Sequence, residues 1–128
     1  RLPWFIAHQS APYQIHVVEL DQKLCGYFFF SPWRDGRAAM REVSEVSYYL
    51  AQEVRGRGIG RYILEQAQQL ALDTGLKYLL AILLETNIGS LTLLEKGGFV
   101  QAGLLPEIAD LGERRCGQLI MYKKLRSS

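Results

Sequence analysis

Three arginines and three glycines lie within Arg55 to Arg61 in the stretch EVRGRGIGRYILEQA, and the apolar pattern of a helix follows at once. Glycines in such a turn let the backbone bend sharply and let a ligand approach the N–H groups without interference from Cβ atoms. The first N–H groups of a helix have no intrahelical partner, and this end of the helix carries about half a positive charge. The turn is therefore predicted to bind an anion, most naturally a phosphate.

The side chains of the turn support this prediction. The glycines are Gly56, Gly58 and Gly60, and the arginines are Arg55, Arg57 and Arg61. Arginine adds charge and bidentate hydrogen bonds to a phosphate. Two common phosphate motifs are excluded, because a P-loop needs Lys-Ser or Lys-Thr in the turn and a dinucleotide fingerprint needs a glycine where Arg61 stands. A solvated basic helix start with turn glycines is the alternative interpretation.

Two strand-like runs and a helical pattern surround the turn. Val43–Leu50 precedes it as a strand, with Glu45 on one face and Val46, Tyr48 and Leu50 on the other. After the turn, one face of an amphipathic helix is formed by Ile63, Leu64, Ala67, Leu70 and Ala71. Leu76–Leu84 is a continuous apolar run of strand length between two helices, which is typical of a buried parallel strand.

The rest of the chain completes one mixed sheet. The other expected elements are strands over Tyr13–Leu20, Leu24–Phe30, Phe99–Leu105 and Gln118–Leu125, a turn over Asp21–Lys23, and a short helix from Thr86 or Asn87 to Lys96. The order β-β-β-α-β-α-β-β predicts an α+β fold with a mixed, mostly antiparallel central sheet. Residues 1–128 are enough for a single domain with one core and too few for two ordinary domains.

Composition narrows the class of function. Hydrophobic residues make up 48% and the net charge is +2, so the chain is globular and lacks the cationic field that drives non-specific nucleic-acid binding. No apolar run approaches the about 20 residues of a membrane span, and no signal-peptide pattern opens the sequence. Cys25 and Cys116 have no metal-ligand spacing, so we expect no metal site and interpret both as reduced thiols of a cytoplasmic protein.

Three stretches carry a family resemblance. Arg55–Gly60 matches R/Q-x-x-G-x-G/A, the pattern of the GNAT family of acetyl-CoA-dependent N-acetyltransferases, and TNIGSLTLLEKGGF (Thr86–Phe99) is similar to the second signature of that family. SPWRDGRAAMREVSEVSYYL resembles the branch of phosphinothricin acetyltransferase-like enzymes, in which a Pro-aromatic-basic loop is followed by an Arg and then by a Glu on the strand before the turn. The resemblance implies a three-layer fold with helices on both faces of the sheet.

The resemblance also implies a binding site for acetyl-CoA. The cofactor would lie between the strands Val43–Leu50 and Leu76–Leu84, which splay apart in this family, and the backbone of Tyr48, Tyr49 and Leu50 would pair with the pantetheine arm. The N–H groups from Gly56 to Arg61, Ile59 included, would hold the pyrophosphate. Asn87 would hydrogen-bond the pantetheine, and Ser90 and Leu94 would lie close to the cofactor.

The chain departs from the family pattern at four points. Leu94 stands where the family often has Tyr or His, so a side chain able to protonate the leaving thiolate is missing there. Gln52 replaces a common Pro, and Met40 stands where the branch has a Tyr. Little of the usual N-terminal strand and helices is visible before Tyr13, so we expect an N-terminally incomplete view of the enzyme.

Amine acetylation needs a base. An alkylammonium with a pKa near 10.4 is about 3.4 units from neutrality at pH 7, so its deprotonation costs about 4.6 kcal/mol. Glu45 is the candidate base, acting through a water, because apolar neighbours would raise its pKa; an ordinary strand carboxylate paired with an arginine is the alternative.

The backbone N–H of Leu50 is the family-like oxyanion donor. The thiolate then leaves unprotonated or takes a proton from water, and Tyr48 and Tyr49 are substitute donors.

The acceptor is predicted from the loop. Arg34 and Arg37 would bind an acceptor carboxylate bidentately, which suits an amino acid or a phosphinothricin or methionine-sulfone analogue; a solvated loop is the alternative. The predicted function is acetyl transfer to a primary amine of a small molecule. A non-catalytic CoA or acyl-CoA sensor and a protein N-acetyltransferase are the alternatives. The branch often pairs subunits near the acceptor site, which is compatible with a homodimer, and no nucleic-acid or membrane partner is expected.

Overall fold

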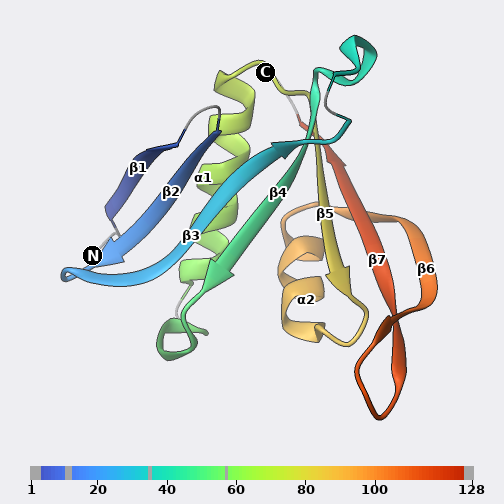
Figure 1. The fold of residues 1–128 in the computed structure, drawn as a ribbon. Coiled ribbons are helices and arrows are strands. Elements are labelled where there is room, and N and C mark those ends of the chain that lie inside the picture. The colour runs from blue at the N-terminus through green and yellow to red at the C-terminus, as the bar shows by residue number, and fades with distance from the viewer. Residues whose placement is uncertain (1–3, 11–12, 35, 57, 126–128) are drawn as a thin grey trace.

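The computed structural model describes residues 4–10, 13–34, 36–56 and 58–125. They form one seven-stranded sheet in the order β1-β2-β3-β4-β5-β7-β6, with two helices (Figure 1). The strands are β1 (Trp4–Ser10), β2 (Tyr13–Leu20), β3 (Lys23–Pro32), β4 (Val43–Leu50), β5 (Tyr78–Leu84), β6 (Val100–Asp110) and β7 (Arg115–Lys124), and the helices are α1 (Ile59–Asp73) and α2 (Ile88–Lys96). The pairing is antiparallel everywhere except between β4 and β5, which confirms the predicted α+β fold with a mixed sheet.

The predicted strands and helices are all present, and β1 is a further strand that was not predicted from the sequence. This strand pairs in full register with β2, from Trp4 opposite Glu19 to Ser10 opposite Tyr13. Its seven residues, WFIAHQS, do not alternate in polarity, so periodicity gave no signal for a strand. The pairing of β1 with β2 is a tertiary interaction, which the strand propensities of single residues do not predict.

The predicted C-terminal hairpin was also too short. β6 extends to Asp110 and β7 begins at Arg115. A register shift between Leu105 and Ala109 accommodates Pro106, and Glu107 next to it has a positive φ of 56°. A bulge of this kind lets a strand continue past a proline that cannot donate to the ladder.

Both helices lie on the same face of the sheet, so the expectation of helices on both faces is wrong for the part of the chain that the structure describes. α1 connects two parallel neighbours, β4 and β5, and Ile63 packs close to the backbone of Gly26 on β3. α2 lies beside α1, because Leu93 approaches Gly60 and Gly97 approaches Leu64. The core between this face and the helices contains Phe28, Val46, Ile63, Leu79, Leu94 and Met121.

The pairing of β4 with β5 stops early. Val43, Ser44 and Glu45 lie opposite Tyr78, Leu79 and Leu80, and beyond these residues β4 and β5 no longer pair with each other. Figure 1 shows the strands side by side at one end and diverging toward their C-terminal ends, where α2 lies near the gap. The predicted splay is therefore present, and it leaves the backbone of Val46–Leu50 without a neighbouring strand on that side.

The remaining sequence expectations concern the thiols and the membrane. Cys25 is 2% exposed and Cys116 is 4% exposed, and both are free thiols. Cys25 is buried in β3, where a free cysteine packs as a small hydrophobic residue. Among the residues described, neither helix is long and apolar enough to cross a bilayer.

Candidate active site

A groove of about 750 Å³ lies at the open end of the β4–β5 gap. The residues expected to bind the cofactor that line it are Tyr48, Tyr49, Leu50, Arg55, Gly56, Gly58, Gly60, Arg61, Asn87 and Ser90. Ile59 is buried and is not among the residues that line the groove, and Arg57 lies outside the described residues. The structure thus brings together residues from β4, the glycine turn, α1 and α2, which lie up to 42 positions apart in the chain.

The floor at one end of the groove is the N-terminus of α1. Gly58 is the N-cap residue with φ +81°, a left-handed conformation that favours glycine. Tyr62 donates the first intrahelical hydrogen bond, to the carbonyl of Gly58 at 3.1 Å. The N–H groups of Ile59, Gly60 and Arg61 precede this bond and have no acceptor among the residues that the structure describes, so they can donate to an anion, with the positive end of the helix dipole behind them.

Gly60 allows α2 to approach this end of α1. A Cβ at position 60 would lie 3.1 Å from Leu93 Cδ2 and 3.4 Å from Leu50 Cδ2, which is tighter than an ordinary contact. The absence of a side chain therefore sets the distance between the walls of the groove. It also leaves the backbone of the helix start open to a ligand.

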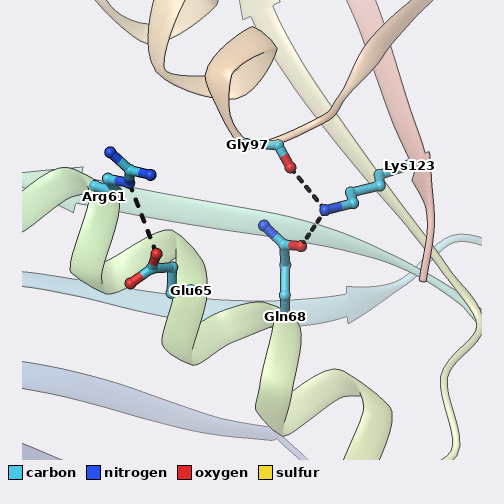
Figure 2. Close-up of polar contacts among 5 residues, drawn as sticks. All are labelled: Arg61, Glu65, Gln68, Gly97 and Lys123. Carbon is cyan, nitrogen blue, oxygen red and sulfur yellow. Dashed lines mark hydrogen bonds and ion pairs between the residues drawn. The ribbon is translucent and has the colours of Figure 1, made fainter. Parts of the chain in front are cut away.

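Arginines of the turn add charge at the rim. Arg61 forms an ion pair with Glu65 at 3.7 Å, with both side chains largely exposed (Figure 2). Such an exposed pair contributes little to stability, so Arg61 can exchange Glu65 for a phosphate at small cost. Arg55 donates to the carbonyl of Leu50 at 3.5 Å, which keeps this guanidinium beside the end of β4.

The opposite wall of the groove is the first turn of α2. Asn87 is its N-cap residue, and its Oδ1 accepts a hydrogen bond from Ser90 N at 3.1 Å. The amide NH₂ of Asn87 then remains as a donor toward the groove, as the family resemblance requires. Ser90 Oγ is hydrogen-bonded to the hydroxyl of Tyr48, which reaches across the gap from β4.

Lys123 closes the back of the groove and was missed by the sequence analysis. Its Nζ donates to Gln68 Oε1 of α1 at 2.6 Å and to the carbonyl of Gly97 at the end of α2 at 2.7 Å (Figure 2). Burial lowers the pKa of this ammonium. Lys123 thus connects β7 with both helices that border the groove, a long-range contact for which the sequence gives no local signal.

Glu45 lies on the other face of β4. It occupies the last paired position before β4 and β5 diverge, opposite Leu80 on one side and Ser31 on the other. Burial raises the pKa of its carboxyl, as predicted from apolar neighbours. Within the described ranges no arginine forms an ion pair with Glu45, so the alternative of a structural ion pair has no support there.

A comparison with protein families decides what this arrangement is. The model of the acetyltransferase (GNAT) family matches residues 1–99, which include β4, the glycine turn, α1 and α2. The chain belongs to the GNAT family of acetyltransferases. Acetyl-CoA is the acetyl donor of this N-acetyltransferase, and the open N–H groups, the missing Cβ at Gly60 and the unpaired edge of β4 fit it.

Relatives with known names support the family assignment of this GNAT acetyltransferase. YwnH of Bacillus subtilis (strain 168), provisionally named a phosphinothricin acetyltransferase, is 34% identical over 127 residues, covering 98% of this chain and 76% of YwnH. The L-methionine sulfoximine/L-methionine sulfone acetyltransferase of Salmonella typhimurium (strain LT2) is 30% identical over 110 residues, covering 84% of this chain and 63% of that protein.

A solved structure shows the same fold with the donor bound. The phosphinothricin acetyltransferase of Sinorhizobium meliloti, in complex with AcCoA, superposes with a TM-score of 0.79 and 29% identity. It matches 88% of this chain, and this chain spans 61% of it. The GNAT chain therefore spans about three-quarters of the Bacillus relative and less than two-thirds of the other two proteins.

The GNAT acetyltransferase has a second pocket, of about 690 Å³, at the other end of α1. Arg34 and Arg37 line it together with Arg41, above a floor that includes His16 and Leu70. The structure therefore does not bring these two arginines into the acetyl-CoA groove. Glu45 lines neither pocket, although Ser31, its partner on β3, lies only three residues before Arg34.

Proposed function

We propose that this chain transfers the acetyl group of acetyl-CoA to the primary amine of a small molecule, most readily an amino acid or an analogue of the phosphinothricin or methionine-sulfone type. The observation that carries the proposal is the groove in which the start of α1, the unpaired edge of β4 and the first turn of α2 converge. The names of the relatives support the acceptor class, since they act on amino-acid analogues.

Acetyl-CoA would enter from the helix side of the sheet. Its pyrophosphate would accept hydrogen bonds from the N–H groups at Gly56–Arg61, with Arg55, Arg57 and Arg61 supplying charge. Its pantetheine arm carries two amides and would pair with the backbone of Tyr48, Tyr49 and Leu50 as an added strand does. Asn87 and Ser90 would contact the arm from α2.

The amine would approach from the opposite face. Glu45 lies five residues before Leu50 on β4, which is roughly 16 Å along the strand at 3.3 Å per residue. Its side chain lies on the face of β4 opposite the helices. A carboxylate with a raised pKa at this position would accept the ammonium proton through a chain of waters that spans this distance, and so recover part of the deprotonation cost. The N–H of Leu50 would stabilise the oxyanion.

Arg34 and Arg37 remain the proposed ligands of an acceptor carboxylate. Support comes from Ser31, which lies directly opposite Glu45, while Arg34 follows three residues later. A chain of three residues spans at most about 10 Å, and the long arginine side chain extends that reach. The pocket that these arginines line is on the helix face of the sheet and Glu45 lies on the opposite face, so their side chains would have to turn around the end of β3 to reach an acceptor beside Glu45.

A cytoplasmic location and a homodimer are further parts of this proposal. The two buried free thiols fit a reducing compartment.

The single core cluster beneath both helices supports a single acetyl-CoA-binding domain over residues 1–128.

A CoA or acyl-CoA sensor without catalysis is the second candidate. One observation favours it: Leu94 is 1% exposed and apolar, so no proton donor stands at that position of α2. A sensor would bind acetyl-CoA in the same groove but would release no thiol. Thiol release measured with a panel of amino acids, phosphinothricin and methionine sulfone separates the two candidates, since binding without turnover contradicts the enzyme.

Glu45→Gln tests the base. We expect kcat/KM for the best amine to fall roughly 100-fold, because general-base catalysis contributes about 10²–10⁴-fold. In the wild type, kcat/KM should rise with pH through a pKa above the ordinary value of Glu, because burial raises the pKa of Glu45. Glu95→Gln removes the same charge from an exposed position on α2 and is the control. A loss of less than tenfold would show that Glu45 is not the base.

A further inference from the structure

Two hydroxyl groups meet inside the groove. Tyr48 lies on the part of β4 that has lost its pairing with β5, and its hydroxyl is hydrogen-bonded to Ser90 Oγ on the first turn of α2. Both residues line the groove, and both are half-buried. The contact spans the gap between the strand that would pair with pantetheine and the helix that faces it.

Tyr49 and Leu94, the neighbouring side chains on β4 and α2, are unsuited to donate a proton at this point. Tyr49 points to the opposite face, where its ring stacks on Tyr27 with 5.4 Å between the ring centroids. Leu94 follows Ser90 by one helical turn on the same face of α2, and it is apolar and buried. Among the residues described as lining the groove, Tyr48 and Ser90 are therefore the hydroxyl pair directed into it.

Acetyl transfer from a thioester releases a thiolate, and an acid beside the sulfur can protonate it. When the amine attacks the carbonyl carbon, a C–N bond forms and the C–S bond breaks, and its electron pair stays on sulfur. A thiolate has a conjugate-acid pKa of about 8.5, so a proton supplied as the C–S bond breaks lowers the charge that develops. The Tyr48 hydroxyl faces the groove beside the strand edge along which the arm would run.

We propose that Tyr48 is the acid that protonates the departing sulfur of coenzyme A, and that Ser90 is the positioning residue that orients its hydroxyl. This inference rests on the proposed acetyltransferase function. The Tyr48 O–H gives its proton to the departing sulfur, so coenzyme A is released as a thiol and Tyr48 becomes a phenolate. The Ser90 O–H then donates to the phenolate until water returns the proton, while the proton lost by the amine leaves through water toward Glu45.

The surroundings of Tyr48 fit this role. Burial raises the pKa of its phenol, so the proton is present at neutral pH, and the hydrogen bond with Ser90 acts in the opposite sense by favouring the phenolate. The hydroxyl is therefore protonated before the reaction and is stabilised as an anion during it.

Tyr48→Phe is the test, because it removes one oxygen and keeps the ring. We expect kcat with the best amine to fall roughly 100-fold, while the Kd for acetyl-CoA measured by calorimetry stays within about twofold. Tyr78→Phe is the matched control: Tyr78 is half-buried on β5 and lines neither pocket. Equal melting temperatures of the variants establish that both fold.

Ser90 is tested by a pair of variants. Ser90→Ala should lower kcat about tenfold, and Ser90→Thr, which keeps a hydroxyl, should restore it to within about threefold of the wild type. Rescue by threonine distinguishes orientation of Tyr48 from a packing role of Ser90.

Three outcomes would overturn the inference. A Tyr48→Phe enzyme with kcat within about threefold of the wild type removes Tyr48 as the acid, and the acetyltransferase function stands. A raised Kd with unchanged kcat assigns the hydroxyl to binding only. If the wild-type chain binds acetyl-CoA and releases no thiol with any amine of the panel, the proposed function and the inference both fail.

Discussion

The two pockets lie at opposite ends of α1 and are built in different ways. The groove proposed for acetyl-CoA lies at the N-terminal end, where the backbone of the helix start, an unpaired strand edge and several glycines meet side chains of both helices. The second pocket lies at the C-terminal end, near Thr74, and is lined by arginines of the β3–β4 loop together with His16 and Leu70. Fifteen residues of α1, or about 22 Å at 1.5 Å per residue, separate the two ends.

This difference between the two pockets explains why the family resemblance predicted the residues of the groove better than those of the second pocket. A backbone site depends on where glycine is required and on how strands and helices are ordered, and both can be read from spacing. A side-chain pocket depends on rotamers and loop conformation, which a motif does not contain. Most of the residues predicted to bind the cofactor line one groove, whereas Arg34 and Arg37 line a separate pocket, and the roles of both sets stay predictions.

The largest effect expected at the groove comes from Gly60→Leu. The position is already tight, because a Cβ there would lie 3.1 Å from Leu93 Cδ2, and a full leucine must push α2 away or fill the groove. We expect the Kd for acetyl-CoA to rise about 100-fold, or about 2.8 kcal/mol. Calorimetry measures the affinity, and a thermal melt measures the overpacking cost of about 1–3 kcal/mol.

Gly103→Leu is the control for Gly60→Leu. A Cβ at position 103 would lie 3.8 Å from Ile120, which is an ordinary contact on the edge strand β6, away from both pockets. Its acetyl-CoA affinity should stay within about twofold of the wild type. A Gly60→Leu protein that also keeps its affinity would show that the start of α1 does not hold the ligand, and the contrast between the two pockets would lose its basis.

A smaller effect is expected at the second pocket from Arg37→Ala. If Arg37 binds the acceptor carboxylate, the loss of a charged hydrogen bond of about 1.5 kcal/mol raises KM for the amine about tenfold. The Kd for acetyl-CoA should not change, because Arg37 is absent from the lining of the groove. Steady-state kinetics and calorimetry measure the two quantities. Arg114→Ala, at an exposed position between β6 and β7, is the matched control. An unchanged amine KM would exclude Arg37 as a ligand of the acceptor.

Much of the fold was predictable because local and global signals agree. β2, β4 and α2 were predicted nearly to their observed ends, since turn residues, alternation and the Asn87 cap all mark the same boundaries. The turn at Asp21 and Gln22 has both residues at positive φ, as a two-residue hairpin requires. β1 and the shared face of both helices were not predictable, because they depend on which surfaces pack together.

The same limit applies within the site. The sequence identified Tyr48 and Ser90 separately, but their hydroxyls meet only because β4 and β5 diverge and α2 lies beside the gap. The bridge from Lys123 to Gln68 and Gly97 joins residues 55 and 26 positions apart. Contacts of this kind carry no periodicity or motif, so a single sequence does not reveal them.

The smallest effect expected concerns the floor of the second pocket. His16 is 4% exposed, and its ring stacks on Phe28 with 4.9 Å between centroids. Burial lowers its pKa below the ordinary value of 6.5, so the folded chain binds fewer protons than the unfolded chain between the lowered pKa and 6.5. The free energy of unfolding should therefore be constant above about pH 7.5 and fall as the pH drops through 6.5. The loss is at most about 1.4 kcal/mol for each pKa unit of lowering.

Urea unfolding at pH 8.0 and at pH 5.5 measures this loss in the wild type and in His16→Gln. Glu45 acts in the opposite direction, because burial raises its pKa and so favours the folded state as the pH falls toward that value. Since Glu45 is present in both proteins, its contribution cancels, and the difference in pH dependence reports His16 alone. His8→Gln removes the other histidine of the chain and should keep the His16 contribution. Equal pH dependence in the wild type and His16→Gln would mean that His16 can be protonated in the folded chain.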